Sequence, residues 1–166
     1  MYNSIESFLS DFEHEFDSTN KYFSAITDDI LEKKFHQNIR TIGWLSWHIV
    51  SSIPEMLNHA GFQICTNHNL DSQPSSVDEL ITTYHTFYQE AVLQIKKSWN
   101  DEILNEDVTM YGQVWKKGLV LSSLLFHQCH HRGQLSILMR LADYKVPGII
   151  GPSKEEWTTY GLEPHK

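Results

Sequence analysis

Hydrophobic positions recur at steps of three and four residues in four segments of the 166-residue chain, which predicts four amphipathic helices. We expect these helices at residues 4–26, 41–60, 76–99 and 119–144. Ser4 is a candidate N-cap of the first helix, and Ser76 with Glu79 has the spacing of a capping box at the third. Gly61 is placed to end the second helix, and Pro147 follows the fourth.

The segments between these helices carry weaker patterns. Residues 27–40 mix charged and apolar positions and predict a connection that contains a short helical turn, whereas residues 62–76 predict a polar loop. Within residues 100–118, the sequence VTMYGQVW alternates around Gly112, which is compatible with a short hairpin or an ordered crossover. The C-terminal tail is rich in turn-forming residues and predicts a helical turn near residues 155–160.

Four helices with little strand signal predict an all-α protein. We expect residues 1–166 to form a single domain, because this length suits one hydrophobic core. The predicted architecture is an antiparallel four-helix bundle, with short irregular segments between the third and fourth helices and at the C-terminus.

Composition and charge exclude several classes of partner. The chain is 40% hydrophobic and 20% charged, and its formal net charge of -8 argues against binding to nucleic acid or to an anionic membrane. No run of about 18 apolar residues predicts a membrane span. Cys65 and Cys129 have no CxxC spacing, and the N-terminal MYNSIESFLSDFEHEF is acidic and amphipathic, unlike a secretory signal. We therefore expect a protein of the reducing cytoplasm.

Polar residues interrupt the fourth helix at its centre, in the sequence FHQCHHRGQ. Apolar side chains precede and follow this stretch, and polar groups in a core cost free energy unless something satisfies them. His127 and His131 are four residues apart, so they are neighbours on one helix face, and Gln134 lies one turn further along the same side. The question is what these side chains bind.

A helical HxxxH pair is typical of half a metal site, because imidazole nitrogens suit zinc, nickel, copper and iron. A third ligand has to come from another helix, and His48 is the other histidine centred in an apolar helical face. Three histidines would leave an open coordination position for water or substrate. The alternative is that His127 and His131 are solvated or hydrogen-bonded, and that His48 is a satisfied core histidine.

The neighbours of this pair have other interpretations. His130 lies about 100 degrees around the helix from His131, which predicts a supporting, interface or surface role. Arg132 also lies off this face, and it forms either a salt bridge or an anchor for an anionic substrate. Gly133 in the middle of a helix suggests close approach of a neighbouring helix. Cys129 is interpreted as a small buried side chain.

These motifs resemble the DinB/YfiT-like superfamily of metalloenzymes. The resemblance rests on a histidine in the second helix (LSWHIV), on HxxxHRGQ in the fourth, and on the tail VPGIIGPSKEEW. It implies a four-helix bundle, often a homodimer, in which His48, His127 and His131 hold a divalent metal ion. Zinc or nickel is the first expectation for that ion, with iron or manganese as alternatives. Family members of known activity are thiol S-transferases and isomerases that use bacillithiol, mycothiol or glutathione.

The leading functional hypothesis is therefore a metal-dependent thiol S-transferase, in which an activated small-molecule thiol attacks an electrophilic substrate. A metal-dependent hydrolase is a weaker hypothesis, because HxxxH lacks the glutamate that serves as general base in HExxH. A third hypothesis is a non-catalytic metal-binding protein of the stress response, inducible by DNA damage.

Overall fold

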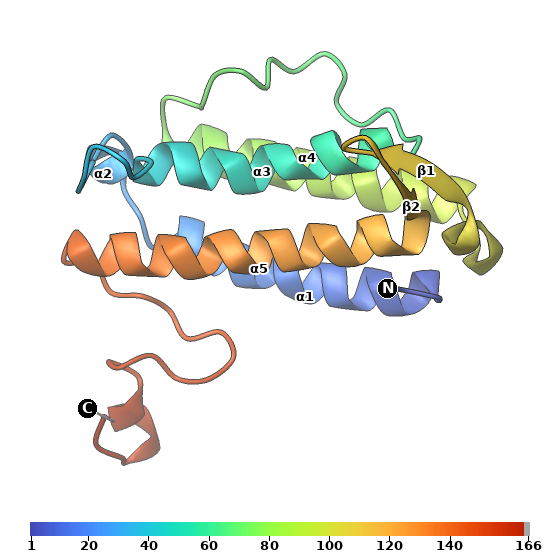
Figure 1. The fold of residues 1–166 in the computed structure, drawn as a ribbon. Helices are drawn as coiled ribbons and strands as arrows, with labels where there is room; N and C mark the ends of the chain where they lie inside the picture. Colours follow the sequence, from blue (N-terminus) through green and yellow to red (C-terminus); the bar gives the residue numbers. More distant parts are fainter. Residues whose placement is uncertain (165–166) are drawn as a thin grey trace.

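The fold is a bundle of four long helices, described here from a computed structural model that covers residues 1–164 (Figure 1). These helices are α1 (Ile5–Phe23), α3 (Ile42–His59), α4 (Val77–Ser98) and α5 (Lys117–Leu141). The shorter elements are α2 (Asp28–Leu31), η1 (Asp101–Asn105), β1 (Asp107–Met110), β2 (Gln113–Lys116) and η2 (Trp157–Tyr160). The predicted four-helix bundle is confirmed.

Side-chain caps begin three of the four long helices. The hydroxyl of Ser4 accepts a hydrogen bond from the backbone N–H of Ser7, and Thr41 caps α3 in the same way. Ser76 accepts from the N–H of Glu79, whose carboxylate accepts in turn from the N–H of Ser75. The capping residues expected from the sequence therefore begin α1 and α4.

The helices form two layers, with α3 and α4 in one and α1 and α5 in the other (Figure 1). A hydrogen bond of 3.0 Å from the N–H of Tyr2 to the carbonyl of Gly118 joins the starts of α1 and α5. The N–H of Val77 donates to Asp28 over 2.7 Å, so α4 begins beside α2, where α3 also begins. Helices α3 and α4 consequently run in the same direction, and the long connection between them returns along the bundle. The antiparallel neighbours are α3 with α5 and α1 with α4.

The core differs between the two antiparallel pairs. Aromatic rings fill the space between α1 and α4, where the ring centroid of Phe16 lies 4.0 Å from that of Tyr88 and 5.0 Å from that of Tyr84. Helices α3 and α5 bring mainly aliphatic side chains, among them Ile42, Leu45, Ile49, Ile53, Val120, Leu121, Leu124 and Leu135. The histidines of interest lie on this second pair.

A two-stranded hairpin connects η1 to α5, as one of the two sequence interpretations predicted. Strands β1 and β2 are antiparallel, with Met110 opposite Gln113, and the turn consists of Tyr111 and Gly112. Both turn residues have positive φ, as two-residue hairpin turns of type I′ require. Across residues 1–164, none of the helices is long and apolar enough to cross a membrane.

Candidate metal centre

Three histidines meet where α3 packs against α5. The ring centroid of His48, from α3, lies 4.8 Å from that of His127 and 4.5 Å from that of His131. The two α5 rings are 4.4 Å apart. One ring nitrogen from each residue lies within 4.8 Å of the others, so the group could hold a metal ion. The structure thus brings together all three residues that the sequence singled out.

Hydrogen bonds fix the orientation of one of these rings. The Nδ1 atom of His131 lies 2.8 Å from the Oε1 atom of Gln134, which can only accept. His131 therefore carries its proton on Nδ1, and the lone pair of Nε2 is free. The amide nitrogen of Gln134 donates over 3.1 Å to His130, which is exposed and stands outside the cluster. This is the kind of outer support that orients a metal-ligating histidine.

The electrostatic surroundings keep the three imidazoles neutral. Burial, and then the proximity of the other histidines, lowers the pKa of both His48 and His127 to about 4. The pKa of His131 is also lowered, chiefly by burial. A neutral imidazole offers a lone pair, whereas an imidazolium does not. The cluster is consequently in its ligand form at neutral pH.

Comparisons with known proteins show the family of the chain. The sequence model of the DinB family matches residues 1–166. A protein of Bacillus subtilis (strain 168), the uncharacterized protein YrdA, is 34% identical over 166 residues, which are 100% of this chain and 99% of the relative. The chain belongs to the DinB family.

Solved structures of DinB-like proteins share the fold. A DinB-like protein from Bacillus cereus ATCC 10987 superposes with a TM-score of 0.84 at 32% identity, over 90% of this chain and 99% of that one. The DinB-like protein YjoA from Bacillus subtilis gives a TM-score of 0.68 at 18% identity, over 84% of this chain and 94% of that one. The second likeness concerns the fold alone.

The donor set of this DinB family member fits a divalent cation. The Nδ1 atom of His127 is buried and has no hydrogen-bond partner, which is costly unless a ligand engages that nitrogen. Two nitrogens on one ion are at most about 4.2 Å apart, because each bond is about 2.1 Å long. Small side-chain rotations would therefore bring these three nitrogens onto one ion.

A pocket of about 680 Å³ opens beside the cluster, and His48 and His131 form part of its wall. The other lining residues come from the segment before α3, from α3 itself and from the C-terminal half of α5, namely Asn38, Ile39, Arg40, Leu45, Gln134, Ile137 and Leu138. This size suits a small molecule. A ligand in this pocket would lie directly against two of the three histidines.

The predictions for the residues around the histidine pair were partly right and partly wrong. Arg132 forms a buried salt bridge with Glu15 of α1, with N–O distances of 2.6 and 3.2 Å, so the salt-bridge interpretation is the correct one. The interpretation of Cys129 was wrong, because its side chain is exposed. The expected close approach at Gly133 was also wrong, since a Cβ there would meet no atom within 4 Å.

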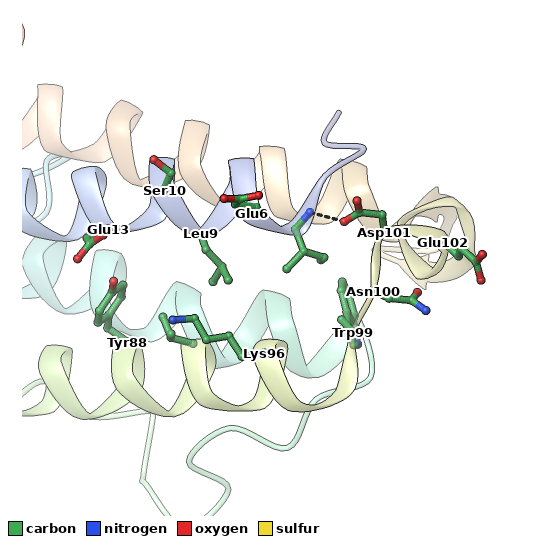
Figure 2. Close-up of a pocket in the computed structure, with 12 residues that line it drawn as sticks. Glu6, Leu9, Ser10, Glu13, Tyr88, Lys96, Trp99, Asn100, Asp101 and Glu102 are labelled. Atoms are coloured by element: carbon green, nitrogen blue, oxygen red, sulfur yellow. Dashed lines mark hydrogen bonds between the residues drawn. The ribbon is translucent and has the colours of Figure 1, made fainter.

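A larger cavity, of about 860 Å³, lies between α1, α4 and η1, on the face opposite the histidines. Figure 2 shows Leu9, Tyr88 and Trp99 along it, with the carboxylates of Glu6 and Glu13 at its edge. Its lining contains no histidine or cysteine. Carboxylates line it, but among the described residues they do not gather closely enough to form a metal-binding group, so the smaller pocket is the better candidate for chemistry.

Sequence reasoning missed the segment 38–40. Arg40 precedes α3, and its guanidinium lies over the ring of Trp44 at 4.1 Å. Trp44 in turn lies 5.6 Å from His48, centroid to centroid. Trp44 and His48 are four residues apart on α3, but Arg40 precedes the helix, so helical spacing does not connect Arg40 with the histidine cluster.

Proposed function

We propose that this protein is a metal-dependent thiol S-transferase whose metal is held by His48, His127 and His131. The observation that carries the proposal is the cluster of three neutral imidazoles at the wall of a small-molecule pocket. Three protein ligands are the number that catalytic metal sites use, because they leave a position open. The proposal includes zinc or nickel as the ion, since imidazole accepts both.

A divalent ion at this place would supply the Lewis acidity that lowers the pKa of a bound thiol. The protein's own part is to hold and shield the reactants. Gln134 keeps the Nε2 lone pair of His131 available, and apolar side chains line the pocket that receives the substrates. The sulfur lone pair forms the new S–C bond, the leaving group departs with its electron pair, and the thiol proton passes to solvent at the pocket mouth.

The positions of the two cysteines support an external nucleophile. Cys65 contacts Glu90 at 2.7 Å, and burial, followed by that carboxylate, raises the pKa of its thiol to about 12. Cys129 is exposed and lines a different pocket, together with residues of the C-terminal tail. Neither sulfur lines the pocket at the histidine cluster. A nucleophile from the substrate pool fits this arrangement better than a protein side chain.

The hydrolase hypothesis has less support. Activation of water at such a site uses a general base, most often a carboxylate or a histidine that is not a ligand. No aspartate or glutamate is among the described residues that line this pocket. The proposed transferase does not need such a base, because the thiol is the more acidic nucleophile.

Metal content and thiol conjugation test the proposal together. Elemental analysis of the purified wild type should give close to one divalent ion per chain, whereas His131→Ala should lose it. His14→Ala is the matched control, because it removes an exposed histidine of α1 that lies outside the cluster, and it should keep the metal. Wild type without metal, or His131→Ala with it, would contradict the site.

The activity is then measured with monobromobimane as the electrophile, and with bacillithiol, glutathione, cysteine and coenzyme A as thiols. We expect conjugation with at least one thiol by wild type and by His14→Ala, and its loss in His131→Ala and after chelation. Metal-loaded protein that accelerates conjugation of none of these thiols would refute the transferase and favour a non-catalytic metal-binding protein.

A further inference from the structure

The three arginines of the chain differ in their partners. Arg132 pairs with Glu15 and Arg140 pairs with Glu155. Arg40 has neither a carboxylate nor a hydrogen-bond acceptor for its guanidinium among residues 1–164, and its guanidinium lies over the face of Trp44. Its five N–H donors are free to bind a ligand.

Arg40 is held close to the histidine cluster. The successive distances of 4.1 and 5.6 Å through Trp44 put the guanidinium within about 10 Å of the His48 ring. A small molecule of a few carbon atoms can therefore reach both the cluster and Arg40.

The pocket wall next to Arg40 is apolar and open. Ile39 and Ile137 are 41% and 60% exposed, and Leu45 and Leu138 lie deeper in the same wall. Apolar side chains gathered in this way around a single cation match a ligand that has an apolar body and one anionic group.

We propose that this pocket binds a small monocarboxylate, with its carboxylate on the guanidinium of Arg40 and its apolar body against Ile39 and Ile137. The guanidinium fork matches the two oxygens of a carboxylate. Arg40 is the sole cationic side chain among the described lining residues, so the pocket suits a monoanion better than a phosphate dianion. The net charge of -8 adds a general repulsion of polyanions.

If the transferase function also holds, the carboxylate belongs to the thiol or to the electrophile. This second step rests on the proposed function, whereas binding of the carboxylate does not. The sulfur of a short mercaptoalkanoate would lie at the cluster while its carboxylate lies at Arg40. Arg40 is thus assigned as the residue that selects substrates by charge.

Calorimetry with hexanoate and with neutral 1-hexanol tests the anion site. We expect metal-loaded wild type to bind hexanoate about tenfold more tightly than 1-hexanol, because one charged hydrogen-bonded pair is worth about that factor. Arg40→Gln should lose this preference. Arg140→Gln removes the same charge from a residue paired with Glu155, and it should keep the preference. Circular dichroism confirms that both variants are folded.

Repeating the titration after chelation excludes binding of the carboxylate to the metal itself. A preference for hexanoate that survives chelation and disappears in Arg40→Gln supports the proposal. No preference in wild type overturns it, and so does a preference that Arg40→Gln retains.

Cobalt-loaded protein separates this proposal from the transferase function. Thiolate binding to Co²⁺ gives a charge-transfer absorption, which is followed with 3-mercaptopropionate and with its neutral analogue 3-mercapto-1-propanol. We expect about tenfold tighter binding of the acid in wild type and equal binding of the two thiols in Arg40→Gln. If neither thiol produces the absorption while hexanoate still requires Arg40, the transferase function fails and the carboxylate site stands.

Discussion

Removal of the Glu15 carboxylate is expected to destabilise the bundle strongly. Glu15 forms two hydrogen bonds with Arg132, whose side chain is 5% exposed, while that of Glu15 is 15% exposed. In Glu15→Ala the guanidinium stays buried, with the hydroxyl of Thr19 at 3.1 Å as its remaining partner. Breaking a buried pair on one side costs about 3–5 kcal/mol, because an uncompensated charge remains. For a chain of this size the melting temperature should fall by roughly 10 °C.

The Arg140–Glu155 pair provides a matched control. It joins the same two residue types, but its side chains are 36% and 33% exposed. Exposed pairs contribute about 0–1 kcal/mol, so Glu155→Ala should lower the free energy of unfolding far less than Glu15→Ala.

Urea denaturation followed by circular dichroism at 222 nm measures both variants, in the presence of a chelator so that metal binding does not add to the stability. The double variant Glu15→Ala/Arg132→Met removes both charges, and it should recover most of the loss. Equal destabilisation by Glu15→Ala and Glu155→Ala would refute the reasoning, and so would a double variant that is no more stable than Glu15→Ala.

Four further predictions concern the cluster and the thiols. Gln134→Leu removes the oxygen that accepts a hydrogen bond from His131 and orients its ring. The zinc affinity measured by calorimetry should therefore fall about 10- to 100-fold; unchanged affinity would contradict this. The pKa of His48 and His127 is about 4, below the ordinary 6.5, so protons should hardly compete with zinc at either residue above about pH 5. The metal-free fold should lose stability as the pH falls from 6.5 towards 4, because the unfolded chain binds protons first. Iodoacetamide at about pH 8 should modify Cys129 and spare Cys65, whose pKa is about 12; mass spectrometry of tryptic peptides detects both.

The helix boundaries show how far local sequence signals reach. Predicted and observed starts of the first three long helices agree within one residue, because each start carries a capping hydroxyl. The end of α5 was predicted three residues late. No glycine marks it, and Asp143 adopts the positive φ that glycine usually supplies. Asparagine and aspartate tolerate this conformation, so an aspartate can end a helix without an obvious signal.

The direction of α4 could not be derived from the sequence. A loop of the length seen between α3 and α4 can either turn back immediately or run along the bundle. The N–H of Val77 reaches Asp28, and this contact selects the second path. The partners are 49 positions apart in the sequence, and neither position has a pattern that indicates the other.

The cluster histidines were predictable because their spacing is local. His127 and His131 share a helix face by periodicity alone, and His48 stands out as a histidine among apolar residues. Arg40 was missed because it precedes the helix, so that the apolar periodicity that defined the helix did not include it.

Close approach of backbone occurs at Gly118, not at Gly133, since a Cβ on Gly118 would lie 2.1 Å from the carbonyl oxygen of Tyr2.

The polar stretch of α5 therefore has two separate physical reasons to exist. His131 and Gln134 turn towards α3 and the pocket, whereas Arg132, about 100 degrees around the helix, turns towards Glu15 on α1. The hydrogen bond between His131 and Gln134 prepares a metal ligand. The salt bridge between Arg132 and Glu15 joins α5 to α1, the other helix of its layer. Because the two contacts share no atoms, loss of Glu15 should reduce stability while the folded protein keeps its metal. Loss of His131 should remove the metal and leave the stability of the metal-free fold nearly unchanged. One sequence motif thus combines a structural contact with a chemical one.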